Sequence, residues 1–268
     1  MKLSFLFYEP IPDLQELSHR MATLAQLGYQ GIELTAMHPP PYPADELLRL
    51  SREHKLPVVS FLSGWSYGHE HLCLSSPDAS IRERAVARLV SYASYAAQVG
   101  GHVVVGLMQG FRSDEPDEAV AATRIADCLR QAVRQAETFN GRFVLEPVNH
   151  LQVGFHHTAA EASALVARVG SPALGYMLDT IHVHIEERSM EETIRQHGAT
   201  IRHFHLCESN GGPFGTGSID VPQVLSTLHA TGYNGYVSVK IYRHLDWHEA
   251  ARSAAEYVLP LIESLNRG

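Results

Sequence analysis

The sequence predicts an α/β protein folded as a (β/α)8 TIM barrel, with a single domain over residues 1–268. Eight short apolar runs typical of strands alternate with longer segments of helical periodicity, and the connections between them are short. A chain of 268 residues also has the length at which this fold is common, roughly 250 residues. A doubly wound open sheet is the alternative, but no GxGxxG turn follows the first apolar run.

The expected strands are short apolar runs that stand between longer helical segments. In chain order they cover residues 3–8, 31–36, 57–62, 102–108, 142–146, 174–179, 201–206 and 235–242. Each run is followed by a segment with a helical period, which is the strand–helix order that a parallel barrel requires.

The expected helices carry apolar residues at helical spacing, and several of them end at a glycine. They cover residues 13–28, 44–54, 80–100, 117–139, 158–170, 189–198, 221–232 and 247–265. The segment between the third strand and the third helix contains Trp65 and several histidines, and we expect it to be a long loop.

The composition narrows the expected partners and location. A formal net charge of -8 argues against nucleic acid, because nucleic-acid-binding domains usually present a basic face. No apolar run approaches the roughly 20 residues of a membrane span, and the N-terminal segment is too short and too soon acidic for a signal peptide. Cys73, Cys128 and Cys207 are widely spaced, which favours buried thiols in a reducing compartment. We therefore expect a cytoplasmic protein that binds neither nucleic acid nor membrane.

The stretch Met177 to Glu187, MLDTIHVHIEE, begins as an apolar strand and then crowds ionisable side chains together. Charged groups cost several kcal/mol to bury unless they are paired or bind a metal. The stretch is therefore either a solvated loop or part of a functional site.

Ionisable residues stand at the ends of four consecutive expected strands. Glu146 ends the fifth strand, Asp179 ends the sixth, His205 lies in the seventh and Lys240 lies near the end of the eighth. Active sites of this fold form where the C-terminal ends of the strands meet, so we expect these side chains on one rim. Two carboxylates and an imidazole are ligands suited to Mn, Co, Mg or Zn. Glu33, in the second strand, is expected to face the substrate or to support this rim.

Three segments carry a family resemblance: LEPVNH (145–150), MLDTIHVHIEE (177–187) and HFHLCESNGGPFGTGSID (203–220). They resemble the xylose isomerase-like barrel superfamily, and within it the ketose 3-epimerases that act on D-tagatose and D-psicose. The resemblance implies a metal-dependent sugar isomerase or epimerase that abstracts a proton next to a carbonyl through an enediolate. It implies a carbohydrate substrate and a divalent metal, Mn²⁺ first, with Co²⁺ or Mg²⁺ as alternatives. It also implies a homo-oligomer, a dimer or tetramer, or pairing with a second subunit.

The resemblance assigns roles to single residues of this chain. Glu146, Asp179 and His205 correspond to three of the four metal ligands of the family, and Glu146 is also a catalytic residue. His182 corresponds to the histidine that hydrogen-bonds the substrate oxygens, and it is a second catalytic candidate. Glu208 corresponds to the acid that follows the histidine ligand, and we expect it to bind substrate. His184 has no counterpart and is expected in a loop.

The chain departs from the family at three positions of the expected rim. Lys240 stands where the family has its fourth ligand, a glutamate; Gly211 replaces an arginine, and Gln152 replaces a glutamate. Lys240 is expected to act as acid or base, with its pKa lowered by a nearby cation, or to stabilise an oxyanion as a charged ammonium. The alternative is a pair with an acid such as Glu208 in a site that has lost its chemistry. Gly211 is expected to open space for a larger keto-glycoside.

Trp65, Gln152 and Arg243 complete the expected substrate-binding residues, and Phe61 is expected to share an aromatic wall with Trp65 or to pack in the core. Two other functions stay open. A lyase acting on a keto-sugar or keto-glycoside also begins by abstracting a proton beside a carbonyl. A non-catalytic sugar-binding protein would keep the degraded ligand set for binding only. An apurinic endonuclease is disfavoured by the acidic charge.

Overall fold

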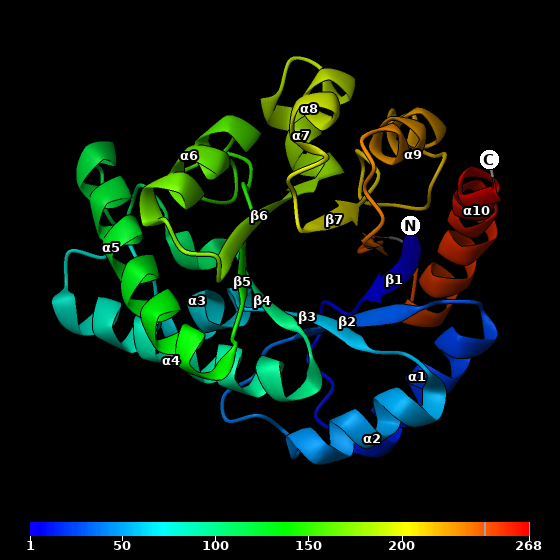
Figure 1. Cartoon of the computed structure of the whole chain (residues 1–268), viewed down its shortest axis with the longest axis horizontal. Helices are drawn as coiled ribbons and strands as arrows, with labels where there is room; N and C mark the ends of the chain where they lie inside the picture. The colour runs from blue at the N-terminus through cyan, green and yellow to red at the C-terminus, as the bar shows by residue number, and fades with distance from the viewer. Residues whose placement is uncertain (244, 268) are drawn as a thin grey trace.

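A computed structural model of the chain describes residues 1–243 and 245–267, and it is a closed parallel barrel surrounded by helices (Figure 1). Each strand pairs with the next along the chain, and the eighth pairs with the first. The strands are β1 (Lys2–Leu6), β2 (Gly31–Thr35), β3 (Val58–Leu62), β4 (His102–Val105), β5 (Phe143–Leu145), β6 (Leu174–Asp179), β7 (His203–Leu206) and β8 (Tyr236–Val239). The predicted (β/α)8 fold is confirmed.

The helices lie outside the barrel and follow the strands in chain order (Figure 1). They are α1 (Leu14–Gln26), α2 (Ala44–His54), α3 (Gly64–Glu70), α4 (Ala79–Val99), α5 (Glu118–Ala136), α6 (Ala159–Val169), α7 (Thr180–Glu186), α8 (Met190–His197), α9 (Val221–Ala230) and α10 (Trp247–Arg267), with single 3-10 turns η1 (Leu107–Gln109) and η2 (Glu137–Phe139). None of these described helices is both long and apolar enough to cross a membrane.

The structure differs from the expected elements mainly on the C-terminal side of the barrel. The segment after β3, expected as a loop, contains the helix α3, and the second half of MLDTIHVHIEE forms the helix α7. The Asp179 carboxylate begins α7 because its Oδ1 accepts a hydrogen bond from the backbone N–H of Ile181 at 3.0 Å. His184 is therefore helical rather than in a loop, and its side chain is exposed. Five strands end earlier than expected, and the largest differences are in β4, which ends at Val105, and β8, which ends at Val239.

The hydrophobic core lies between the sheet and the helices, and aromatic residues of the strands are among its largest fully buried side chains, including Phe143 and Phe204. The two ends of the chain also meet. The N-terminal ammonium of Met1 donates to Oδ1 of Asn266 at 2.7 Å, and the Asn266 amide donates to the Met1 carbonyl at 2.9 Å. These bonds tie the last turn of α10 to the entrance of β1, beside the seam where β8 closes the barrel.

The start of α6 gives a direct test of how local sequence supports the fold. Thr158 and Glu161 form a capping box: Oγ1 of Thr158 accepts from the Glu161 N–H at 3.2 Å, and the Glu161 carboxylate accepts from the Thr158 N–H at 2.9 Å. We predict that Thr158→Ala lowers the free energy of unfolding in urea by about 1 kcal/mol, because a helix N–H loses its partner. Thr123→Ala, inside the exposed face of α5, is the control. An equal loss in both variants would contradict the capping role.

Candidate active site

Four consecutive strands deliver ionisable side chains to one point at the C-terminal end of the barrel. Glu146 follows β5, Asp179 ends β6, His205 lies in β7 and Lys240 follows β8, and all four are buried. Nδ1 of His205 lies 3.3 Å from Oε1 of Glu146 and 3.5 Å from Oδ2 of Asp179. The Lys240 ammonium forms an ion pair with the same Oδ2. The strand-end residues expected on one rim are therefore in mutual contact.

His182 joins this cluster from the first turn of α7. Its Nε2 lies 3.7 Å from Oε1 of Glu146 and 3.8 Å from Oδ2 of Asp179. Its Nδ1 accepts a hydrogen bond from the Asn149 amide at 2.8 Å, and the Asn149 oxygen is engaged by the Leu151 N–H, which fixes the amide orientation. Burial lowers the pKa of His182 despite the nearby Asp179 carboxylate. The neutral ring consequently carries its proton on Nε2, facing the carboxylates.

Glu33 lies beneath the cluster, fully buried in the barrel interior. Its carboxylate accepts from Nε2 of His203 at 2.5 Å and from Nε2 of His205 at 3.1 Å, and it also accepts from the Ser60 hydroxyl. The bond to Glu33 fixes which nitrogen of His205 turns downward, so Nδ1 must face Glu146 and Asp179. Glu33 thus supports the rim, which is one of the two roles expected for it. It is not among the described residues that line the cavity above the cluster.

The charged groups of the cluster shift one another's pKa values. Burial alone would lower the pKa of Lys240, but the Asp179 and Glu146 carboxylates outweigh it and raise the pKa well above its ordinary value. Burial alone would raise the pKa of Asp179, but the charge of Lys240 outweighs it and lowers the pKa well below its usual range. The carboxylates around His205 likewise outweigh its burial and raise its pKa. The lowered pKa expected for Lys240 depends on a nearby cation and stays a prediction.

The ligand set fits a divalent cation. Within the described part of the chain, the buried atoms Nδ1 of His205 and Oδ2 of Asp179 make no hydrogen bond, although Oδ2 has its ion pair with Lys240. Oε1 of Glu146 lies beside them, so a nitrogen and two carboxylate oxygens converge on one place. Ligand atoms of Glu146, Asp179 and His182 also lie within 4.8 Å of one another. The Lys240 ammonium is a competing cation for Asp179.

A cavity of about 280 Å³ opens above the cluster. Glu146, His182 and Lys240 line it, together with two of the residues expected to bind substrate, Trp65 and Gln152. Trp65 is stacked on His69 with ring centroids 3.5 Å apart, so α3 presents a flat aromatic surface on this side. The remaining lining residues are Tyr8, Thr35, Leu62, Ser63, Gly64, Gly68, His69, Val104, Gly106, Leu107 and Val148.

Two residues expected to bind substrate lie elsewhere. Glu208 is fully buried, and its carboxylate accepts from the backbone N–H groups of Ser209 at 2.9 Å and Gly215 at 3.1 Å. Its oxygens hold the loop after β7 and do not reach the cavity, so we reassign Glu208 to loop positioning. Arg243 has an exposed side chain, and it too is missing from the described residues around the cavity. Glu208 turns into the loop because it lies just past the strand end, whereas substrate binding by Arg243 stays a prediction.

Gly211 does not open space for a larger substrate. A Cβ at this position would lie 2.4 Å from the ring of Tyr242, and the backbone has a positive φ of 69°. The Tyr242 ring therefore fills the volume that a side chain at residue 211 would need, and it packs edge-on against Tyr8 at 5.6 Å. The expectation of an opened pocket at this glycine was wrong because a residue 31 positions later occupies the space.

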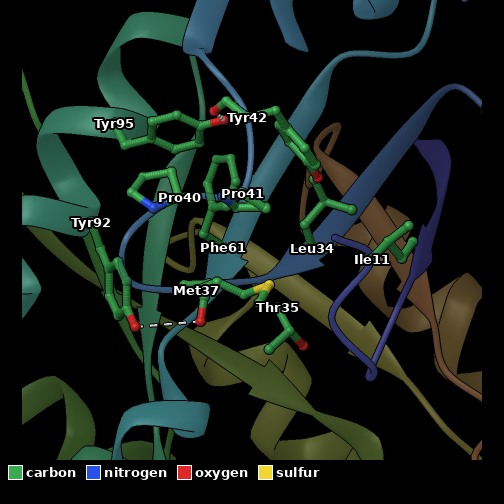
Figure 2. A pocket seen from close by; sticks show the side chains of 11 residues that line it. Ile11, Leu34, Thr35, Met37, Pro40, Pro41, Tyr42, Phe61, Tyr92 and Tyr95 are labelled. Atoms are coloured by element: carbon green, nitrogen blue, oxygen red, sulfur yellow. Dashed lines mark hydrogen bonds between the residues drawn. The ribbon is translucent and has the colours of Figure 1, made fainter. Parts of the chain in front are cut away.

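Phe61 does not form an aromatic wall with Trp65. It is buried in a different hollow, between the segment after β2 and the helix α4, where it packs edge-on against Tyr95 at 5.5 Å (Figure 2). Tyr92 donates to the Ala36 carbonyl at 3.3 Å on the same side (Figure 2). The accessible volume of this hollow is about 20 Å³, against about 280 Å³ for the cavity above the cluster, so it is too small for a sugar. Phe61 is therefore a packing residue.

Two residues of the site, His203 and Asn149, were not expected from the sequence. His203 stands two positions before His205, and alternate residues of a strand point to the same face. This spacing was the available signal that both imidazoles meet one acid. Asn149, in LEPVNH, holds His182 from a different strand end, and no local pattern reveals that contact.

The sequence of the chain also matches that of a known protein family. Residues 21–261 match the family described as xylose isomerase-like TIM barrel. The chain belongs to this family. The L-ribulose 3-epimerase of Mesorhizobium japonicum is 27% identical over 221 residues, which are 81% of this chain and 73% of the relative. The D-psicose 3-epimerase of Agrobacterium fabrum is 28% identical over 218 residues, 80% of this chain and 75% of the relative.

A solved structure has the same fold along almost the whole chain. The D-psicose 3-epimerase from Clostridium cellulolyticum H10 aligns with a TM-score of 0.84 and 22% identity, and the alignment covers 99% of both chains. The resemblance to ketose 3-epimerases seen in the three sequence segments is confirmed by these relatives.

A further histidine, His156, holds the backbone of Glu146 through the side chain of Gln109. The Gln109 amide donates to the Glu146 carbonyl at 3.1 Å, and Nδ1 of His156 donates to the Gln109 oxygen at 2.9 Å. Burial lowers the pKa of His156 from 6.5 to about 4. The imidazole is therefore neutral at the pH of most assays, and it fixes Glu146 through Gln109.

We predict a loss of stability as pH falls from 6.5 towards 4, because the unfolded chain then binds a proton at His156 that the folded chain does not. Between pH 7.5 and 4.5 the wild type should lose about 2 kcal/mol more than His156→Asn, in urea unfolding. Asparagine tolerates the positive φ of 54° at this position. His19→Asn, on the exposed face of α1, is the control. Parallel pH profiles for wild type and His156→Asn would contradict this assignment.

Proposed function

We propose that the protein is a divalent-metal-dependent sugar isomerase or epimerase, which moves a proton next to the carbonyl group of a carbohydrate. One observation carries the proposal. Oε1 of Glu146, Oδ2 of Asp179 and Nδ1 of His205 converge at the base of an open cavity, and the last two lack a hydrogen bond within the described residues. The similarity to an L-ribulose 3-epimerase and a D-psicose 3-epimerase supports a ketose as the kind of substrate.

Glu146, Asp179 and His205 are the residues that would hold the metal, with Mn²⁺ as the first choice and Co²⁺ or Mg²⁺ as alternatives. A bound cation would polarise the substrate carbonyl and stabilise negative charge on its oxygen. The buried Glu33 carboxylate supports this arrangement because it keeps Nδ1 of His205 pointed at the ligand place.

Glu146 is the proposed base, because its carboxylate lines the cavity and its lowered pKa keeps it ionised and able to accept a proton. It would remove the proton on the carbon beside the carbonyl, giving an enediolate. His182, whose Nε2–H faces the same space, would donate a hydrogen bond to a substrate oxygen. Trp65 and Gln152 would contact the rest of the sugar from the cavity wall.

Lys240 is the proposed electrostatic partner of this reaction. Lys240 does pair with a nearby acid, as the alternative of a site without chemistry expected, but the acid is Asp179 and not Glu208. Its raised pKa keeps the ammonium charged beside Asp179, and a charged ammonium suits stabilisation of the enediolate oxygen. As a cation beside Asp179 it also opposes the binding of a second cation.

Proton exchange in deuterated water tests the proposal. The protein, loaded with Mn²⁺, is incubated with a panel of ketoses and 3-keto-glycosides, and NMR follows deuterium at the carbons beside each carbonyl. Deuterium uptake with formation of an isomer is the expected result, and removal of the metal by a chelator should abolish it. Loss of water or aglycone would replace the proposal by a lyase. Bound metal without exchange on any substrate would replace it by a sugar-binding protein.

We predict that Glu146→Gln lowers the exchange rate at least about 100-fold, because an amide cannot accept the proton. Glu118→Gln, an exposed glutamate at the start of α5, is the matched control and should exchange at the wild-type rate. Circular dichroism verifies that both variants are folded. A Glu146→Gln variant with wild-type exchange would remove Glu146 from the reaction.

We predict that Lys240→Met binds Mn²⁺ about tenfold more tightly than the wild type, because a competing buried cation is removed. Its turnover should nevertheless fall, because the oxygen that becomes negative loses the ammonium. Calorimetric titration with Mn²⁺ and the exchange assay measure the two effects separately. Weaker metal binding together with unchanged turnover would contradict both roles of Lys240.

A further inference from the structure

A second cavity lies at the opposite, N-terminal mouth of the barrel. Its volume is about 270 Å³, and several of its lining residues are the first residues of their strands. The lining consists of Pro57, Val58, Val59, Gly100, His102, Arg142, Arg202, His203, Gly235 and Tyr236. The candidate active site occupies the other end of the same strands, so the two cavities are separated by the barrel interior.

The N-terminal mouth is basic although the chain as a whole is acidic. Arg142 and Arg202 line the cavity, and no aspartate or glutamate does so among the described residues. Neither arginine forms an ion pair with a carboxylate in residues 1–243 and 245–267. Lys2, at the start of β1, adds an ammonium 5.1 Å above the ring of Tyr236. In a chain of net charge -8, such a group of cations without acids is unexpected from composition alone.

The Arg202 guanidinium is held in a defined place. One of its terminal nitrogens donates to the Pro172 carbonyl at 2.8 Å. Its stem lies against Gly175 so closely that a Cβ on that glycine would be 2.3 Å from Cδ of Arg202. The nearby charge of Arg142 contributes, after burial, to lowering the pKa of Arg202. Two guanidinium groups therefore face one hollow with their mutual repulsion uncompensated by an acid.

His102 also lines this cavity, but its Nε2 is closed off from the open space. Its Nε2 is inaccessible to solvent and makes no hydrogen bond within the part of the chain that the structure describes. Its ring lies edge-on to His203, with centroids 5.2 Å apart. Burial, then the neighbouring His203, lowers the pKa of His102 to about 3. The lowered pKa keeps the His102 ring neutral, so the positive charge at this mouth comes from the arginines and Lys2.

We propose that the N-terminal mouth binds the phosphate group of a small molecule. Arg142 and Arg202 would each direct N–H groups at the oxygens, which suits the fork geometry of guanidinium and phosphate. The cavity is larger than a phosphate ion needs, so a phosphorylated metabolite fits the space as well as the charge. This site is independent of the reaction proposed for the other end of the barrel.

The test is calorimetric titration of the purified protein with inorganic phosphate at low ionic strength and pH 7, since salt screens exposed charges. We expect one phosphate per chain. Arg142→Gln and Arg202→Gln should each weaken binding at least about tenfold. Arg112→Gln, an exposed arginine paired with Glu118, is the matched control and should bind as the wild type does. Lys240→Met should also bind as the wild type does, which separates this site from the candidate active site.

A second titration, with a sugar phosphate, distinguishes a phosphorylated metabolite from free phosphate as the ligand. A sugar phosphate that binds more tightly than inorganic phosphate would show that the rest of the cavity contributes contacts. Equal affinity for both would limit the site to the phosphate group itself. Arg142 makes no side-chain hydrogen bond in the described chain, so its replacement should leave the fold intact, and a thermal unfolding scan verifies this. Absence of phosphate binding, or binding that survives both arginine replacements or is lost in Lys240→Met, would overturn the proposal.

Discussion

The burial of opposite charges in the middle of the barrel is the constraint on which the C-terminal rim depends. Glu33, Glu146 and Asp179 are carboxylates with almost no exposure, and each would cost several kcal/mol if left uncompensated. Lys240 and His205 supply the positive charge that lies among them. Each group is stable in its charged form only because its neighbours are charged, so the cluster behaves as a unit rather than as separate residues.

Because these charges depend on one another, Lys240 affects the whole cluster and not only its own position. A lysine at the end of β8 places its ammonium on Asp179, the residue that also offers an unbonded oxygen to a cation. Metal binding and the lysine pair therefore draw on one carboxylate. The affinity of the site for a metal depends on how easily the ammonium leaves Asp179 and finds other partners, such as a substrate oxygen in the cavity.

The two ends of the barrel have opposite chemical character, and a buried chain of contacts lies between them. The C-terminal end gathers carboxylates around an open cavity, whereas the N-terminal mouth gathers arginines. His203 belongs to the N-terminal cavity and bonds Glu33, and Glu33 in turn bonds His205 of the ligand set. One buried acid thus contacts a histidine of each site.

The sequence by itself determined the barrel and the meeting of its main site residues. The alternation of strand and helix periods is a local property, and parallel closure necessarily brings the strand ends that carry Glu146, Asp179 and His205 to one rim. Only the tertiary structure decided where side chains beyond the strand ends turn. Glu208 turns into its loop, the Tyr242 ring fills the space at Gly211, and the short helix α7 carries His182 back over the cluster. These placements depend on contacts between residues distant in sequence, which no local pattern of polarity encodes.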